Sequence, residues 1–237
     1  MSKEALNKRL ARLPMAVSER RGDDGAMYRV QRLQPLPISF DEERHKYLWE
    51  PTGEWMAHSV TEIVGATKDA RAMANIMATK HVWEPRGLAV HAAMESFANG
   101  ADPETLLGGP YDAWIKPLLS YPMWESVEVI ACEYRLCDLR RSIGGSFDLL
   151  VWDHLLDCMC LIDLKTQSRS GRPYDTSPQL GGYVAMGIDR LGLVVDQCCT
   201  LWCKPGETHL SGDQTPERCL AAWEDSYSAW SMLQEEL

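Results

Sequence analysis

Two short stretches decide the fold: Gly144-Gly145-Ser146-Phe147-Asp148 and Leu161-Ile162-Asp163-Leu164-Lys165-Thr166. Alternate side chains of a strand share a face, so Asp163 and Lys165 lie on one face of the second stretch. If the stretches pair as an antiparallel hairpin around residues 154–157, Asp148 lies directly opposite Asp163. Two like charges at that separation repel. The pattern therefore predicts a divalent cation between them, with Lys165 as a fixed positive charge beside it.

The remaining sequence predicts an α/β fold, with a central mixed β-sheet flanked by helices and a helical cap on its N-terminal side. Residues 149–151 and 161–164 are too continuously apolar to have a wet face, which favours central strands. Ser59-Val60-Thr61-Glu62 has the form of a capping box and should begin a helix. The other expected helices cover residues 4–13, 69–82, a segment from Pro85 to Asn99, 111–120, a segment capped by Ser177 and ending near Gly192, and a segment from Thr215. The other expected strands cover residues 28–33, 46–49, 127–137 and 193–203.

Four motifs, at residues 86–95, 144–148, 163–165 and 179–183, occur in an order that resembles the PD-(D/E)XK nuclease superfamily. The pattern Gly-x-x-x-Asp followed by Asp-x-Lys is similar to the superfamily core, at Asp148 and at residues 163–165. Residues 179–183 resemble the Gln-x-x-x-Tyr motif of the RecB-like branch, and residues 86–95 resemble its upstream Gly-x-x-x-His helix. The resemblance covers roughly residues 38–205. Within it, residues 38–47 and 59–63 are also similar to small phage exonucleases and the mitochondrial genome maintenance exonuclease.

This resemblance implies a DNA exonuclease that hydrolyses phosphodiester bonds from a free end, in phage or replication-linked DNA processing. The partner would be DNA, either single-stranded or duplex with a free end. The cofactor would be Mg²⁺ or Mn²⁺, because oxygen ligands suit Mg²⁺ and an imidazole ligand shifts preference toward Mn²⁺. The implied metal ligands are His91, Asp148, Asp163 and the backbone carbonyl of Leu164.

The same resemblance implies roles for the remaining motif residues. Lys165 would position the attacking water and stabilise charge that develops on the phosphate. Gln179 and Tyr183 share one helical face and would contact the DNA backbone or hold Lys165 in place. The implied catalytic residues are Asp148, Asp163, Lys165, Gln179 and Tyr183.

Three residues keep a second interpretation. His91 lies in an apolar helical run, where an isolated histidine is usually a hydrogen-bonded core residue, and the other motifs favour the ligand role. Glu95, four residues later, is either a partner of His91 or part of an ordinary helix surface. Glu133 is either a further site carboxylate or an exposed strand residue, and the sequence favours the exposed residue.

The net charge of −10 argues against DNA binding, since Lys and Arg contacts to phosphate supply most non-specific affinity. The charge is unevenly spread, because residues 1–35 hold eight Lys and Arg against four acids. We therefore expect a basic N-terminal arm and first strand over residues 1–37, mobile at 20–25, before a single nuclease domain over 38–237. A basic groove is also expected, unless its arginines form a solvated loop face. These arginines are Arg140, Arg141, Arg169 and Arg172.

The sequence shows no apolar stretch long enough to span a bilayer and no signal peptide, so we expect a cytoplasmic protein without a membrane partner. The eight cysteines follow no disulfide framework and are expected to be free thiols. Some RecB-like nucleases carry a four-cysteine iron–sulfur cluster, but residues 1–131 contain no cysteine to supply its upstream ligand. Cys198 and Cys199 would also point to opposite faces of a strand. We therefore expect no iron–sulfur cluster.

Two other functions remain open. One is a structure-specific or nicking DNA endonuclease of the same fold, which would use the same side chains. The other is a non-catalytic DNA-binding or assembly protein, which would be expected to have lost a carboxylate or the lysine. Because Asp148, Asp163 and Lys165 are all present, the sequence favours an enzyme. Oligomeric state and digestion polarity stay open.

Overall fold

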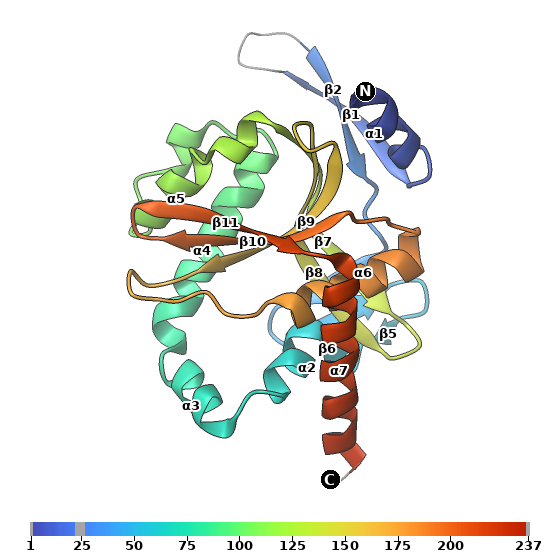
Figure 1. Ribbon diagram of the computed structural model, residues 1–237, viewed down its shortest axis with the longest axis vertical. Coiled ribbons are helices and arrows are strands. Elements are labelled where there is room, and N and C mark those ends of the chain that lie inside the picture. The colour runs from blue at the N-terminus through green and yellow to red at the C-terminus, as the bar shows by residue number, and fades with distance from the viewer. Residues whose placement is uncertain (1, 22–26, 236–237) are drawn as a thin grey trace.

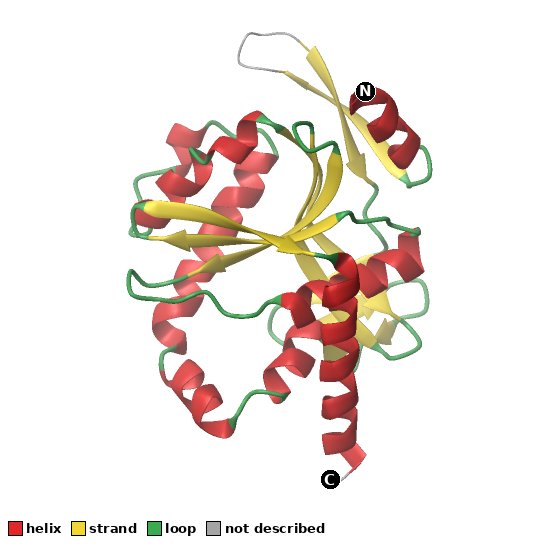
Figure 2. Ribbon diagram, in the orientation of Figure 1, coloured by secondary structure: helices red, strands yellow, loops and turns green. Residues whose placement is uncertain are grey.

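A computed structural model describes residues 2–21 and 27–235 and contains a six-stranded sheet at its centre (Figures 1 and 2). The strand order is β11-β10-β9-β8-β6, and β7 pairs with β8. Neighbouring pairs are antiparallel for β7–β8, β8–β9 and β10–β11, and parallel for β9–β10 and β6–β8. The sheet is therefore mixed, as predicted. Its strands are β6 (His58–Ser59), β7 (Val127–Asp138), β8 (Ile143–Asp153), β9 (Cys158–Thr166), β10 (Gln197–Lys204) and β11 (Glu207–Gln214).

Helices cover both faces of this sheet, which confirms the predicted α/β class (Figure 1). Helices α4 and α5 pack on one face, over a core that includes Leu149 and Ile162. Helices α2, α6 and α7 pack on the other face, over a core that includes Leu150 and Leu161. Strands β8 and β9 are thus buried on both sides, as their apolar sequences predicted. The helices are α2 (Val60–Ala66), α3 (Ala70–Ala78), α4 (Lys80–Ala98), α5 (Asp112–Leu119), α6 (Ser177–Leu191) and α7 (Pro216–Glu235), with short 3₁₀ helices at Pro103–Leu106 and Pro122–Glu125.

The predicted hairpin and the predicted capping box are both present. Leu149 pairs with Ile162 at the end of the β8–β9 ladder, so Asp148 and Asp163 are the next residues of the two strands beyond the last pair. At the start of α2, the Glu62 backbone N–H donates to Ser59 Oγ (3.1 Å) and the Ser59 N–H donates to the Glu62 carboxylate (3.3 Å). These two bonds satisfy helix N–H groups that otherwise lack partners.

Several element boundaries differ from the predictions. Pro85 lies inside α4, where a helix break was expected, so the helix that carries His91 begins at Lys80. The N-cap of α6 is Thr176, one residue before the expected Ser177. Strand β10 begins at Gln197, later than expected, and the sequence analysis missed β11 altogether.

The N-terminal segment forms a small unit that packs on the main core. Its elements are α1 (Ser2–Leu10), the β1–β2 hairpin (Met15–Arg21 and Met27–Leu33) and the three-stranded sheet β3–β4–β5 (Ile38–Asp41, Lys46–Trp49 and Glu54–Trp55). Leu6, Leu10 and Leu33 are buried in the same cluster as residues of α6 and α7. Of the stretch 20–25 expected to be mobile, Arg20 and Arg21 belong to β1, and the rest lies outside the described residues.

Helices α6 and α7 approach closely at Gly181. A β-carbon at this position would overlap the carbonyl oxygen of Cys219 and lie 2.8 Å from Trp223 Cβ. Gly181→Ala must therefore move two packed backbones, and we expect it to lower the free energy of unfolding by about 2 kcal/mol or more. Urea denaturation measures this change through its midpoint.

Gly87 in α4 provides the matched control. A β-carbon there meets only Thr166 Oγ1 at 4.0 Å, an ordinary contact distance. Gly87→Ala should leave stability unchanged or raise it by up to about 1 kcal/mol, because alanine has the higher helix propensity. Equal midpoints for the two variants would show that α6 and α7 do not need this close approach.

Candidate active site

Three carboxylates lie in a row across β7, β8 and β9. The pairs Cys132–Leu149 and Tyr134–Phe147 place Glu133 opposite Asp148, and Asp148 and Asp163 lie one residue beyond the last β8–β9 pair, Leu149–Ile162. Glu133 is only partly exposed, and the two aspartates are buried. The row therefore gathers acidic groups at the middle of the sheet, where their charges require compensation.

His91 provides part of that compensation from α4. Its Nδ1 atom lies 3.1 Å from Glu133 Oε1 and 3.3 Å from Asp148 Oδ1. The ligand atoms of His91, Glu133 and Asp148 all lie within 4.8 Å of one another. One imidazole and two carboxylates at this spacing suit Mn²⁺ or Mg²⁺, so these residues fit the cation implied by the sequence.

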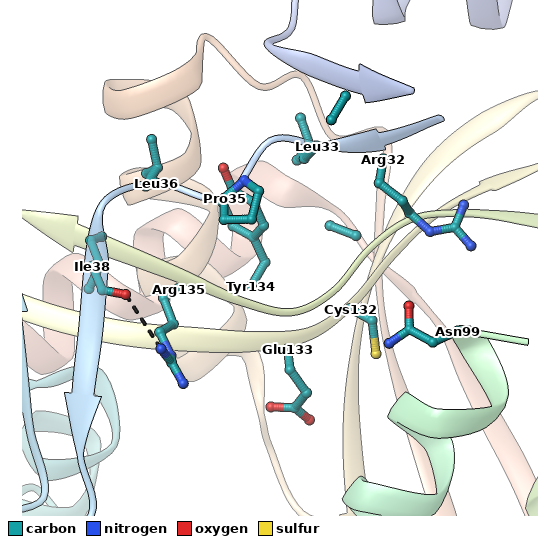
Figure 3. Close-up of a pocket in the computed structure, with 12 residues that line it drawn as sticks. Arg32, Leu33, Pro35, Leu36, Ile38, Asn99, Cys132, Glu133, Tyr134 and Arg135 are labelled. Carbon is teal, nitrogen blue, oxygen red and sulfur yellow. Dashed lines mark hydrogen bonds between the residues drawn. The ribbon is translucent and has the colours of Figure 1, made fainter. Parts of the chain in front are cut away.

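Glu133 has an unusual backbone for a strand residue. Its φ of 46° lies in the left-handed region, and the β7–β8 register shifts between Val129 and Ala131. Figure 3 shows the Glu133 and Arg135 side chains extending from the same side of β7. They line a cavity of about 310 Å³ together with Arg32 and Asn99. Of the three carboxylates in the row, Glu133 lines this cavity, and Asp148 and Asp163 do not.

The electrostatics of the group of three follow from burial and mutual proximity. Burial disfavours charge on His91, but Asp148 and Glu133 outweigh it and raise the pKa of His91 to about 10. Burial also opposes ionisation of Asp148, yet His91, Lys165 and the Leu164 N–H hold its pKa below the ordinary value. The pKa of Glu133 is raised, chiefly by burial. Without a metal, protonated His91 therefore supplies the positive charge between Glu133 and Asp148 that a bound cation would otherwise supply.

Asp163 and Lys165 form a separate ion pair beside the group of three. Lys165 Nζ lies 2.9 Å from Asp163 Oδ1 and 2.8 Å from Oδ2. Burial and then Asp148 raise the pKa of Asp163, against the opposing effect of Lys165, to about 6. Burial disfavours charge on Lys165, but Asp163 outweighs it and raises the lysine pKa. Asp163 therefore lies close to Asp148, but its carboxylate forms its ion pair with Lys165.

Asp148 is held in position by the adjacent strand. The backbone N–H of Leu164 donates to Asp148 Oδ2 at 2.5 Å. The predicted ligand set used the carbonyl of Leu164, whereas the contact between Leu164 and Asp148 is made by its N–H. This hydrogen bond fixes one carboxylate oxygen, while the other lies near His91.

Gln179 and Tyr183 lie on α6, on the other side of the sheet from His91. Gln179 Nε2 donates to Tyr183 Oη at 3.0 Å, so the two predicted residues form a pair. Burial, followed by Asp163 and Asp148, raises the pKa of Tyr183 well above its ordinary value. A β-carbon at Gly145 would lie 2.9 Å from the Tyr183 ring, so glycine is needed there for the ring to reach the strand.

Two residues near the site were not assigned to it by the sequence analysis. The interpretation of Glu133 as an exposed strand residue is wrong, because its side chain is 28% exposed and contacts His91. Pairing residues 127–138 with 143–153 as a hairpin would have placed Glu133 opposite Asp148. Tyr47 lies against Gly144, and Arg135, Glu133 and Asp148 all influence its pKa, which burial raises to about 12. Nothing in the sequence around Tyr47 indicates that it lies beside β8 near these carboxylates.

The other candidates lie outside the cluster. Glu95 is exposed, and His91 contacts Glu133 and Asp148 instead. Arg140 pairs with Asp189 of α6, and Arg141 pairs with Glu224 of α7. Arg169 and Arg172 are exposed in the loop that follows β9. The basic groove therefore stays a prediction, carried by these two arginines.

The cysteines and the helices agree with the sequence patterns described above. All eight cysteines are free thiols. Cys198 and Cys199 belong to core clusters on opposite faces of the sheet, as predicted from their adjacency. Within residues 2–21 and 27–235, no helix combines the length and the apolar character needed to cross a bilayer.

Comparisons with known proteins give little further information. No protein-family model and no curated protein matches the sequence. A solved structure described as "Crystal structure of SSO0001" is similar to the chain, with a TM-score of 0.33 and 14% sequence identity. The similarity covers 72% of this chain and 75% of that chain.

Proposed function

We propose that the protein is a metal-dependent deoxyribonuclease, and specifically an exonuclease that starts at a free DNA end. One observation carries this proposal. Glu133, Asp148 and Asp163 form a row of carboxylates, with His91 against one part of the row and Lys165 against the other. This combination of acidic ligands, an imidazole and a separate, partly buried ammonium group supports phosphodiester hydrolysis better than a purely structural ion cluster.

His91, Glu133 and Asp148 would hold the Mg²⁺ or Mn²⁺ ion, with Asp163 next in the row. A bound divalent cation lowers the pKa of a water molecule and polarises a phosphoryl oxygen. The Leu164 N–H holds Asp148 so that its second oxygen stays directed toward His91. For His91 to act as a ligand, its shared proton must leave, since the ligand form of histidine is neutral.

Lys165 supplies the fixed positive charge of the proposed reaction. Its ammonium group donates a hydrogen bond to Asp163 Oδ1 and lies 2.8 Å from Oδ2, so it is oriented before substrate arrives. Such a group stabilises negative charge that develops on the phosphate during hydrolysis. The Gln179–Tyr183 pair lies on α6, which packs on the opposite face of the sheet from α4. The pair would orient the DNA backbone or support Lys165.

The exonuclease assignment rests on the resemblance in sequence and on charge distribution. The basic residues of the first 35 positions would help to hold the entering strand. Exposed members of this group include Lys8 and Arg12 on α1 and the turn after it. An enzyme that needs a DNA end should spare DNA without one.

End-labelled linear single strands, linear duplexes and covalently closed circles, incubated with Mn²⁺ or Mg²⁺, test the proposal. We expect linear DNA to be degraded and closed circles to survive. Linearisation of the circles, followed by degradation, would favour an endonuclease of the same fold. No cleavage of any substrate would contradict the nuclease proposal. Asp148→Asn protein purified in parallel shows whether a contaminating nuclease contributes.

His91→Ala tests the imidazole as a ligand. Losing it should raise the Mn²⁺ concentration for half-maximal cleavage by more than about tenfold, the lower limit seen when a supporting partner of a ligand is lost. The Mn²⁺ to Mg²⁺ activity ratio should fall as well, because the remaining oxygen ligands suit Mg²⁺. The measurement is a pair of metal titrations at saturating DNA.

His154→Ala is the matched control. His154 also contacts a carboxylate, Glu128, at 3.4 Å, but it lies at the tip of the β8–β9 hairpin. Its loss should leave both titrations unchanged. A histidine 91 variant with lower thermal stability and an unchanged metal ratio would make His91 a structural residue.

A further inference from the structure

Tyr174 is an exposed aromatic residue in the loop 167–176, which joins β9 to α6. Its relative exposure is 52%, although it follows the Asp-x-Lys strand by only a few residues. An aromatic side chain exposed to this degree adds little to a core, and its ring is accessible to a ligand.

The loop that carries Tyr174 is fixed at both ends. Trp114 Nε1 donates to the Gln167 carbonyl at 2.7 Å, and Gln167 Nε2 donates to the Arg172 carbonyl at 2.6 Å. At the other end, the hydroxyls of Thr176 and Thr200 are 2.5 Å apart and buried. Tyr174 is therefore presented from an anchored segment.

Tyr174 lies close to Lys165 through a shared neighbour. Its ring meets Trp202 edge-on, with centroids 5.0 Å apart, and Trp202 is the β10 residue paired with Lys165 in the parallel ladder. Tyr174 and Lys165 are therefore both neighbours of Trp202, which joins the exposed ring to the lysine assigned to phosphate.

A second cation lies over the same ring. Lys68 Nζ is 5.8 Å from the Tyr174 ring centroid, and Lys68 belongs to the connection between α2 and α3. Lys68 is exposed, so its ammonium group can reach an anion as well as the ring. Proteins bind single strands with aromatic rings that stack on bases and with cations that contact phosphates, so this ring and this cation supply both kinds of contact.

We propose that Tyr174 and Lys68 bind one unpaired nucleotide of the DNA strand next to Lys165. The base stacks on the exposed part of the Tyr174 ring, and Lys68 contacts a backbone phosphate. The inference rests on the proposed function and extends it to the kind of DNA that is bound. A base inside a duplex does not present its face to a protein ring, so the site selects single-stranded DNA at this position.

Binding of fluorescently labelled oligo-dT, measured by anisotropy in EDTA, tests this inference without cleavage. Tyr174→Ala should weaken binding about tenfold, a typical loss for one base–aromatic stack, and Tyr174→Trp should restore it. Lys68→Ala should lower the slope of log affinity against log salt by about 0.7, the value for one phosphate contact on a single strand. Tyr174→Ala should leave that slope unchanged.

Trp55→Ala is the matched control. Trp55 is 37% exposed and lies under Arg44 at 5.2 Å, so it is a second aromatic–cation pair, on β5. The Trp55→Ala variant should bind oligo-dT with the same affinity as the unaltered protein. A series of oligonucleotides with one abasic position adds a stacking readout. One abasic position should weaken binding to the unaltered protein about as much as Tyr174→Ala does, and should have little further effect in that variant.

The outcomes separate this inference from the proposed function. Unchanged binding by Tyr174→Ala, a larger loss in Trp55→Ala, or no oligo-dT binding by the unaltered protein would each overturn the inference. Metal-dependent cleavage would still be measured independently. Tyrosine-dependent binding without any cleavage by the unaltered protein would instead uphold the nucleotide site and contradict the nuclease. Circular dichroism confirms that each variant is folded, as expected for exposed side chains.

Discussion

Asp148→Asn is expected to reduce metal-dependent cleavage to below about one thousandth of the original rate. Asp148 is the central carboxylate of the row and the one that contacts both His91 and the Leu164 N–H. A catalytic cation supplies several kcal/mol of transition-state stabilisation, and each 1.36 kcal/mol corresponds to a factor of ten. Initial rates on a labelled single strand, with Mn²⁺ up to millimolar concentrations, measure the loss. We expect the same result for Asp163→Asn.

The matched control is Asp157→Asn, which makes the same chemical change at the exposed tip of the same hairpin. Its rate should be unchanged. The pKa of Asp148 lies below the ordinary value, so its ionised form stabilises the fold above the ordinary aspartate pKa, and this contribution is lost as the pH falls through the folded-state pKa. Asp148→Asn should therefore melt earlier at neutral pH but remain folded at the assay temperature. Substantial cleavage by this folded variant would remove Asp148 from the active site.

Lys165→Met is expected to lower turnover by at least about two orders of magnitude, as for the loss of one electrostatic stabiliser. The half-saturating DNA concentration should change far less, because the contact forms with the transition state. The variant should also lose stability, because Asp163 is 1% exposed and would keep a buried charge without its partner. Removing one member of a buried pair typically costs about 3–5 kcal/mol.

Two further variants separate these effects. Asp163→Asn combined with Lys165→Met removes both charges and should recover stability without recovering turnover. Lys204→Met removes a lysine from the neighbouring strand β10, where it pairs with Glu207, and should retain activity. Because Asp163→Asn alone is expected to abolish cleavage, turnover by the double variant would contradict the proposed roles of both Asp163 and Lys165.

Local sequence signals predicted the elements around the site well. The alternating and apolar patterns of residues 143–166 gave the hairpin with its register, and Ser59 with Glu62 gave the start of α2. Errors arose where tertiary packing overrides local preference. Pro85 should end a helix, but α4 continues through it because buried residues of the same helix, such as Arg86 and Val90, pack on the body of the protein.

The site was only partly predictable for a related reason. Motif spacing indicated His91, Asp148, Asp163 and Lys165, because each belongs to a short pattern. Glu133 belongs to none, and its role depends on how β7 pairs with β8. The division of the row into a cluster of three and an ion pair depends on side-chain directions at the level of single ångströms. No pattern in the chain encodes those directions.

The left-handed backbone of Glu133 has a consequence for how this protein can change. A non-glycine residue with φ near 46° in a strand carries roughly 1–2 kcal/mol of conformational strain, which glycine would remove and asparagine would reduce. Either replacement also removes one of several neighbouring negative charges, at the expense of the 3.1 Å contact with His91. The relief of strain and repulsion opposes the loss of that contact, so selection for heat resistance alone should accept Gly or Asn at position 133, whereas selection for the proposed cleavage should restore Glu. Heat resistance and activity would draw this single position in opposite directions.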